Sequence, residues 1–123
     1  MKRSPALISF SREHHSALVL AMRINRAGND VHALAAVQPA PAFLADLEAH
    51  FSAEEAQFSA TLATLPQLAC RFADDHAELR ALMARLHATE LTVLPEFGQK
   101  LAAHVRFEER ELFPALEALT AAD

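Results

Sequence analysis

Long stretches rich in alanine, leucine, glutamate and arginine, with few β-branched residues, constrain the fold of this chain most strongly. These residue types favour helix, and no segment shows the alternation typical of a strand. Glycine and proline interrupt the stretches, and an irregular crossover is expected between Gly28 and Pro41. The pattern predicts an all-α fold with long helices over residues of about 5–27, 41–64, 66–92 and 95–114, and a short terminal turn or kink after Pro114.

Size and composition exclude several classes of protein. The 123 residues suffice for a single domain, which we expect to span residues 1–123. A net charge of −5 offers no basic surface to nucleic acid or anionic lipid, and two glycines cannot build a glycine-rich phosphate loop. One cysteine excludes a disulfide-stapled scaffold. The longest apolar run, residues 17–22, is far shorter than a membrane span of about 20 residues, so a cytoplasmic protein without membrane contact is expected.

One histidine lies in the middle of the apolar face of each long helix. On helical wheels these inward residues are His14, His50, His76 and His104. The segments "HFSAEEAQFSATL", from His50, and "HVRFEERELFPAL", from His104, repeat each other with an offset of 54 residues, which aligns Glu54 with Glu108. Each glutamate follows its histidine by one turn, so both side chains share a helix face.

Six ionisable groups directed into one core need a partner. A lone inward histidine, or a histidine and glutamate one turn apart, is usually only packed or hydrogen-bonded. Each unsatisfied group costs about 1–3 kcal/mol, however, and six together would offset the stability of about 5–15 kcal/mol that a domain has. Mutual hydrogen bonds would satisfy part of the set, but the full set is what a metal centre between helices requires. The pattern therefore predicts a metal site.

The number and type of donors favour a pair of iron ions. Four imidazoles and two carboxylates are too many ligands for one tetrahedral zinc ion and too rich in nitrogen for calcium or magnesium. Shared between two ions, they give each ion two imidazoles, and both carboxylates can bridge. A solvent-derived oxo or hydroxo bridge would complete the pair and leave one position open. The Glu-x-x-His motif of ferritin-type oxidases is absent from the chain, which disfavours that class.

The motifs "EHHSAL", "HFSAEE", "DDHAEL" and "HVRFEERELFP" resemble those of hemerythrin-like, or HHE cation-binding, domains, from about residue 6 to 117. The resemblance implies an up-and-down antiparallel four-helix bundle that holds a non-haem di-iron centre. The metal ligands that it implies are His14, His50, Glu54, His76, His104 and Glu108. His15 and Glu109 stay open as alternatives to their neighbours His14 and Glu108, because the wheels assume ideal helices.

The resemblance also implies a function. Members of the family bind oxygen, nitric oxide or peroxide at one iron, so binding or sensing of such a ligand is the expected activity. Oxygen carriers have a second histidine one turn after the third-helix histidine, where this chain has Arg80, and simple oxygen transport is therefore disfavoured. His87 lies about 16 Å along the helix from His76, too far to replace it. Two alternatives stay open: a peroxidase- or oxidase-like enzyme with an external electron donor, and an interaction module with zinc or no metal. No catalytic residue is assigned.

The remaining polar residues have simpler interpretations. Asp46 and Gln57 lie near the inward edge of their helix, but solvated border residues are the expectation for both. We expect Cys70 to be an inert core thiol rather than a redox sensor. The side chains expected on the solvated surface are Glu13, His32, Glu55 and Glu109.

Overall fold

The computed structural model describes residues 3–121 and contains helices and loops, with no strand among these residues. The helical segments are α1 (Ile8–Ala27), α2 (Val31–Ala36), α3 (Pro41–Leu62), α4 (Pro66–His87), the 3-10 turn η1 (Leu91–Val93), α5 (Leu94–Phe107), the π-helical turn η2 (Glu108–Leu112) and α6 (Phe113–Ala121). The predicted all-α class is confirmed. The count of helices is larger than the predicted four, because one extra helix forms and the last long helix is divided.

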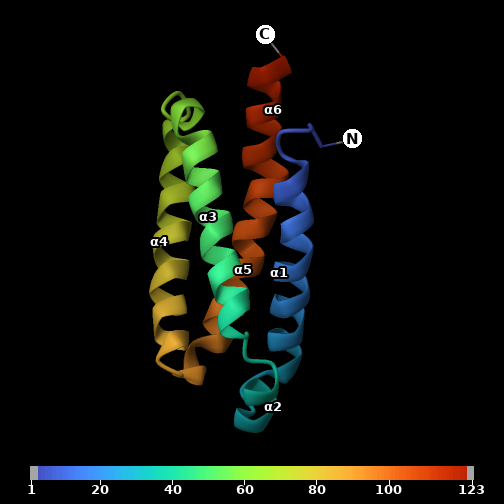
Figure 1. Cartoon of the computed structure of the whole chain (residues 1–123), viewed down its shortest axis with the longest axis vertical. Helices are drawn as coiled ribbons and strands as arrows, with labels where there is room; N and C mark the ends of the chain where they lie inside the picture. The colour runs from blue at the N-terminus through green and yellow to red at the C-terminus, as the bar shows by residue number, and fades with distance from the viewer. Residues whose placement is uncertain (1–2, 122–123) are drawn as a thin grey trace.

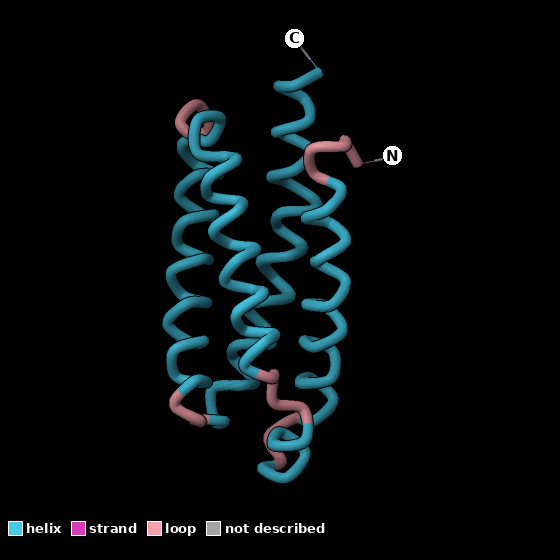
Figure 2. Tube along the Cα trace, viewed as in Figure 1, coloured by secondary structure: helices cyan, strands magenta, loops and turns pink. Residues whose placement is uncertain are grey.

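The long segments lie side by side along the long axis of the molecule (Figure 1). Helices α1, α3 and α4 follow one another, and α5, η2 and α6 continue without a break as the last rod of the bundle. The loops, coloured pink in Figure 2, gather at the two ends of the rods. No helix within residues 3–121 is both long enough and apolar enough to cross a membrane.

The crossover between α1 and α3 differs from the prediction. Helix α1 ends at Gly28, whose φ of 62° suits glycine, and the next residues were expected to be irregular up to Pro41. Instead, they include the short helix α2. The side chain of Asp30 caps this helix by accepting a hydrogen bond from the backbone N–H of Ala33 at 2.8 Å, and Leu34 is buried. An aspartate before a short alanine-rich stretch was the signal that the prediction overlooked.

The last rod also departs from the prediction. Helix was expected to end at Pro114 in a turn or kink, yet α6 continues past this proline to Ala121. Directly before α6 the chain forms the π-turn Glu108–Leu112, in which hydrogen bonds span five residues. Because proline cannot donate to the carbonyl four residues earlier, a change in the hydrogen-bond ladder at this point lets the rod continue.

The apolar core has two parts, and the predicted ligand histidines lie between them on every long helix. One cluster is mostly aliphatic and includes Ile24, Leu79 and Leu101; the other is rich in phenylalanine. The histidines therefore sit at mid-height in the bundle, with apolar layers on both sides.

Helices α1 and α5 approach closely because Gly98 has no side chain: a Cβ at this position would lie 3.0 Å from a methyl group of Ile24.

Candidate metal centre

All six residues predicted as metal ligands point into the interior. They are the buried polar or charged side chains of the described part of the chain, and none is more than 6% exposed: His14, His50, Glu54, His76, His104 and Glu108. Helix α1 supplies one histidine, α3 a histidine and a glutamate, α4 one histidine, and the last rod a histidine and a glutamate. The structure thus brings the complete predicted set together.

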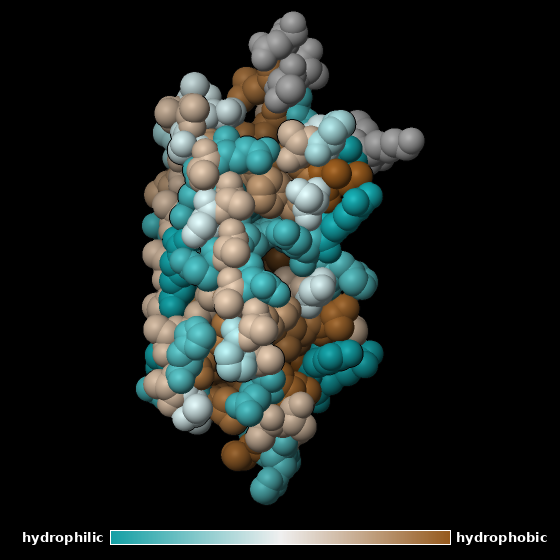
Figure 3. All heavy atoms as spheres, in the orientation of Figure 1, coloured by the Kyte–Doolittle hydropathy of each residue, from teal (hydrophilic) through white to brown (hydrophobic). Residues whose placement is uncertain are grey.

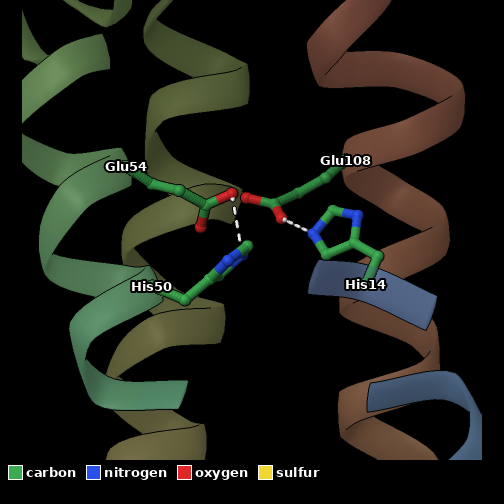
Figure 4. Close-up of side chains that lie close together, drawn as sticks. All are labelled: His14, His50, Glu54 and Glu108. Carbon is green, nitrogen blue, oxygen red and sulfur yellow. Dashed lines mark hydrogen bonds and ion pairs between the residues drawn. The ribbon is translucent and has the colours of Figure 1, made fainter. Parts of the chain in front are cut away.

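The inward atoms form two groups that share both glutamates. His14 and His50 lie with Glu54 and Glu108 in one group, and each residue offers an atom within 4.8 Å of the others. Figure 4 shows the two carboxylates of this group pointing toward one another between the helices. His14 Nε2 lies 2.8 Å from Glu108 Oε1, and His50 Nε2 lies 3.2 Å from Glu54 Oε2.

The second group combines the same glutamates with the other two histidines. His76, His104, Glu54 and Glu108 again offer atoms within 4.8 Å of one another. His76 Nε2 lies 3.3 Å from Glu54 Oε1, and His104 Nε2 lies 3.3 Å from Glu108 Oε2. Each glutamate therefore presents one oxygen to each group, which is the arrangement that two neighbouring ions bridged by carboxylates would use.

On the outer side, each histidine Nδ1 contacts a carboxylate from a neighbouring rod. The four contacts are His50 to Glu13 at 2.6 Å, His76 to Glu55 at 2.7 Å, His104 to Asp75 at 2.9 Å and His14 to Glu109 at 2.6 Å. Each of these acids is the direct sequence neighbour of a predicted ligand on its own segment. The four acid–histidine contacts link α1 to α3, α3 to α4, α4 to α5 and η2 to α1, and so close a ring around the bundle.

The hydrogen bonds of this ring determine where the lone pairs of the histidines point. A carboxylate only accepts, so each Nδ1 carries the hydrogen and donates it, which leaves Nε2 of a neutral ring as an acceptor facing inward. The inward glutamate oxygens are acceptors too. Both Glu54 oxygens, one Glu108 oxygen and Nε2 of His76 and His104 are buried without a hydrogen-bond partner. Acceptors that face acceptors require a cation between them, and the donor set fits a metal ion.

The comparison with protein families agrees with this geometry. Residues 6–116 match the family described as hemerythrin HHE cation binding domain. The chain belongs to this family. Neither the curated proteins nor the solved structures gave a significant match to the chain. For this HHE domain, the family and the buried cluster of histidines and glutamates together indicate a site compatible with metal binding.

Without metal, the HHE cluster holds protons in its place. Burial alone would lower the pKa of His50, but the Glu54 and Glu13 carboxylates outweigh it and raise the pKa to about 9. Burial likewise opposes protonation of His104, whereas Asp75 and Glu108 raise its pKa to about 9. Burial would raise the pKa of Glu108, yet its contacts with the His104 and His14 imidazoles hold it far below its usual range. The cluster thus attracts positive charge.

The π-turn carries two consecutive glutamates that both serve the HHE site, as Glu54 and Glu55 do in α3. Glu108 is fully buried and faces the ligand groups, while Glu109 contacts Nδ1 of His14 and receives a hydrogen bond from Ser11 at 2.7 Å. Glu109 was expected on the outer surface, which is wrong, because its carboxylate reaches sideways to the next rod, as those of Glu13 and Glu55 do. Of the two histidines considered as the ligand from the first helix, His14 is buried and its neighbour His15 is exposed.

Other polar residues lie outside the HHE cluster. His15, His32 and His87 are exposed, as expected for His32. Asp46 is exposed, and the exposed Gln57 donates a hydrogen bond to the backbone carbonyl of Ala6 at 3.1 Å. Both residues therefore lie at solvated border positions, as expected.

Three expectations for polar residues were wrong. Cys70 is exposed rather than buried. Glu13 and Glu55 were assigned to the solvated surface, yet they hold His50 and His76. Helical wheels missed them because such contacts reach sideways to the next rod. Their position directly beside a ligand in the sequence, shared by Asp75, was the available signal.

Arg80 occupies the position where oxygen carriers of the family have a further histidine. Its guanidinium pairs with Glu55 at 2.6 Å and with Glu48 at 2.8 Å. The hydrogen bonds from Arg80 lower the pKa of Glu55, so this carboxylate stays ionised and keeps its contact with His76. Arg80 thus supports a ligand residue instead of adding a fifth imidazole.

Proposed function

We propose that this HHE domain is a non-haem di-iron protein that binds or senses a small ligand such as oxygen, nitric oxide or peroxide. The observation that carries the proposal is the pair of donor groups, each with two histidines, that share Glu54 and Glu108. Because the two groups share both carboxylates, an ion in one group would lie close enough to an ion in the other for the two to act as one centre.

The donor chemistry supports iron. Each group offers two imidazoles and two carboxylate oxygens and contains no thiolate, and the six residues together are more than one tetrahedral zinc ion needs. Iron bound there supplies a redox-active centre at which a small ligand takes a free position. His14 and His50 would hold one ion, His76 and His104 the other, and the shared glutamates would contact both.

The protein's own side chains prepare the site. The ring of outer carboxylates fixes the orientation of all four imidazoles, which saves the entropy of ordering them when metal enters. Phenylalanines surround the rings: Phe51 stacks on His76 at 4.3 Å between centroids, and Phe113 stacks on His14 at 5.6 Å. These apolar contacts limit the access of water and strengthen the electrostatic contacts inside.

Ligand access is favoured from the side of α1 and α3. A cavity of about 580 Å³ opens between these helices and reaches His14, His50 and His104. A small ligand entering there would meet the group that contains His14 and His50 first. His76 does not line this cavity.

Anaerobic reconstitution with ferrous iron tests the proposal. Two irons per chain are expected, together with absorption bands in the near ultraviolet that change on exposure to oxygen or nitric oxide. The chain has no tyrosine or tryptophan, so these bands stand clear of protein absorbance. A protein that takes up no iron and keeps its helicity and melting temperature in chelator would overturn the proposal. Tight binding of zinc with no stable iron complex would also overturn it.

A further inference from the structure

The cavity beside the metal site is much larger than a diatomic ligand needs. Its volume is about 580 Å³, whereas a water molecule occupies about 30 Å³ in the liquid. Sites for small organic molecules have volumes of about 300–1,000 Å³. Figure 3 shows the surface hollowed between α3 and α1, with hydrophobic colour inside the opening and hydrophilic side chains beside it. The space therefore has the size of an organic ligand site.

The walls of the cavity are largely apolar in its depth, where His14, His50 and His104 also face it, and acidic at its mouth. Phe10, Leu47 and Phe51 are buried wall residues. Glu13 and Asp46 are exposed at the mouth, one from α1 and the other from α3, and no lysine or arginine lines the cavity. A ligand that suits these walls has an apolar body and a positive charge at one end.

The carboxylate ring around the histidines points to the same ligand charge. Three of its four acids are paired with an arginine: Glu109 with Arg3 at 3.2 Å, Glu55 with Arg80 at 2.6 Å, and Asp75 with Arg71 at 3.0 Å. Glu13 is the exception, because its carboxylate contacts His50 and pairs with no lysine or arginine within residues 3–121. Its side chain is 54% exposed and lies at the cavity.

We propose that this cavity binds a small organic cation, an amine with an aromatic or alkyl body. The ammonium group lies between Glu13 and Asp46, where it takes the place that an arginine has beside the other ring acids. The apolar body packs against Phe10 and Leu47 and reaches toward His50. The effect of this ligand on the metal centre rests on the proposed function, whereas binding itself needs only the cavity and its acidic mouth.

Three molecules of nearly equal shape test the charge preference: 2-phenylethylammonium, 2-phenylethanol and phenylacetate. Titration calorimetry at neutral pH measures their dissociation constants with iron-loaded and with chelator-treated protein. The ammonium compound should bind about tenfold more tightly than the alcohol, because it gains charge-assisted contacts at the mouth. Phenylacetate should bind most weakly, since the acids repel it. Equal binding of all three, or no binding of the ammonium compound at millimolar concentration, would overturn the proposal.

Paired variants locate the binding site. Asp46→Asn should weaken binding of the ammonium compound about tenfold and leave the alcohol unaffected. Asp74→Asn, at an exposed aspartate of α4 outside the cavity, should change neither. Ala49→Phe narrows the mouth and should weaken both compounds, while Ala45→Phe, at an exposed alanine of the same helix that does not line the cavity, should not. Equal effects of the cavity variants and their controls would contradict the proposal.

Iron content measured on the same samples separates this proposal from the function proposed above. Protein that takes two irons but binds no amine would refute the cavity ligand alone. Protein that binds the amine with the expected charge preference but takes no iron would refute the di-iron function alone. In iron-loaded protein the amine should also shift the near-ultraviolet bands, because its body reaches His50.

Discussion

The two halves of the metal centre use the same donors in different surroundings. His76 and His104 are each 1% exposed, and Phe51 and Phe72 lie within 6.4 Å of both rings, measured between centroids. The acids that hold these two histidines are each paired with an arginine of α4. This half is closed by packing and by completed ion pairs, except where His104 reaches the cavity between α1 and α3.

The half formed by His14 and His50 is open by comparison. Both residues line the cavity between α1 and α3. Glu13, which holds His50, is partly exposed and has no arginine partner in the described chain. A symmetric set of donors therefore does not make a symmetric site: under the proposed function, the closed half would hold the ions in place, and the open half would admit the ligand.

Removal of a carboxylate shared by both halves should have the largest effect. Glu54→Ala deletes oxygen ligands of both groups, so we expect iron content to fall from two ions per chain to nearly none. Iron analysis after anaerobic reconstitution measures this, and circular dichroism checks that the helices persist. Glu96→Ala, at an exposed acid of α5, serves as the control and should keep both ions. Retention of two irons in Glu54→Ala would show that the halves do not share this residue.

Removal of one histidine from either half should have a smaller effect. His50→Ala in the open half and His104→Ala in the closed half should each lose at least one iron per chain, because each deletes half of the imidazoles of one group. His87→Ala, at an exposed position of α4, should lose none. If both ligand variants bound two irons as tightly as the unchanged protein, the assignment of the two halves would fail.

Much of this centre could be predicted from the sequence because helical periodicity is a local property. The inward positions of His14, His50, His76 and His104 follow from the apolar residues of their own helices, and the His–Glu pairs follow from one-turn spacing. The energetic cost of burying these groups then indicates a metal without knowledge of the tertiary structure.

The missed features depend on contacts between helices or on departures from ideal geometry. The contacts of Glu13 and Glu55 reach another rod, and their own helices give no sign of such partners. Glu109 likewise contacts a histidine of another rod, and it lies in a π-turn that a wheel of constant pitch cannot show. The cavity arises from how α1 and α3 face each other, a property of the packed bundle alone. Sequence therefore predicted the donors, but not the difference between the halves.

The pH dependence of the metal-free protein should show that both halves store protons. His50 in one half and His104 in the other have pKa values raised from 6.5 to about 9. A raised pKa stabilises the folded state fully below pH 6.5, and this contribution is lost as pH rises through 9. We expect the free energy of unfolding of chelator-treated protein to fall over this range by an amount on the order of 2–3 kcal/mol for each of the two histidines.

Chemical denaturation across this pH range measures the effect, with the variants His50→Gln and His104→Gln as a matched pair. Each variant should remove part of the pH dependence, since each half contributes one titrating histidine. Iron-loaded protein should respond in the opposite sense and lose metal toward low pH, where protons compete for the imidazoles. A metal-free protein whose stability is flat or rises between pH 6.5 and 9 would contradict the charge assignment.

Removal of the arginine that supports the closed half should have the smallest effect on iron binding. Arg80→Gln removes the ion pair that holds Glu55 against His76, so the imidazole becomes less well oriented, and iron affinity should fall about tenfold. Arg85→Gln is the matched control, because Arg85 lies on the same helix and pairs at 2.8 Å with Glu90, an acid that contacts no ligand histidine. Competition with a chelator of known affinity measures both variants. If they bound iron equally well, the arginine behind the carboxylate would be dispensable, and the closed half would owe its rigidity to the phenylalanine packing alone.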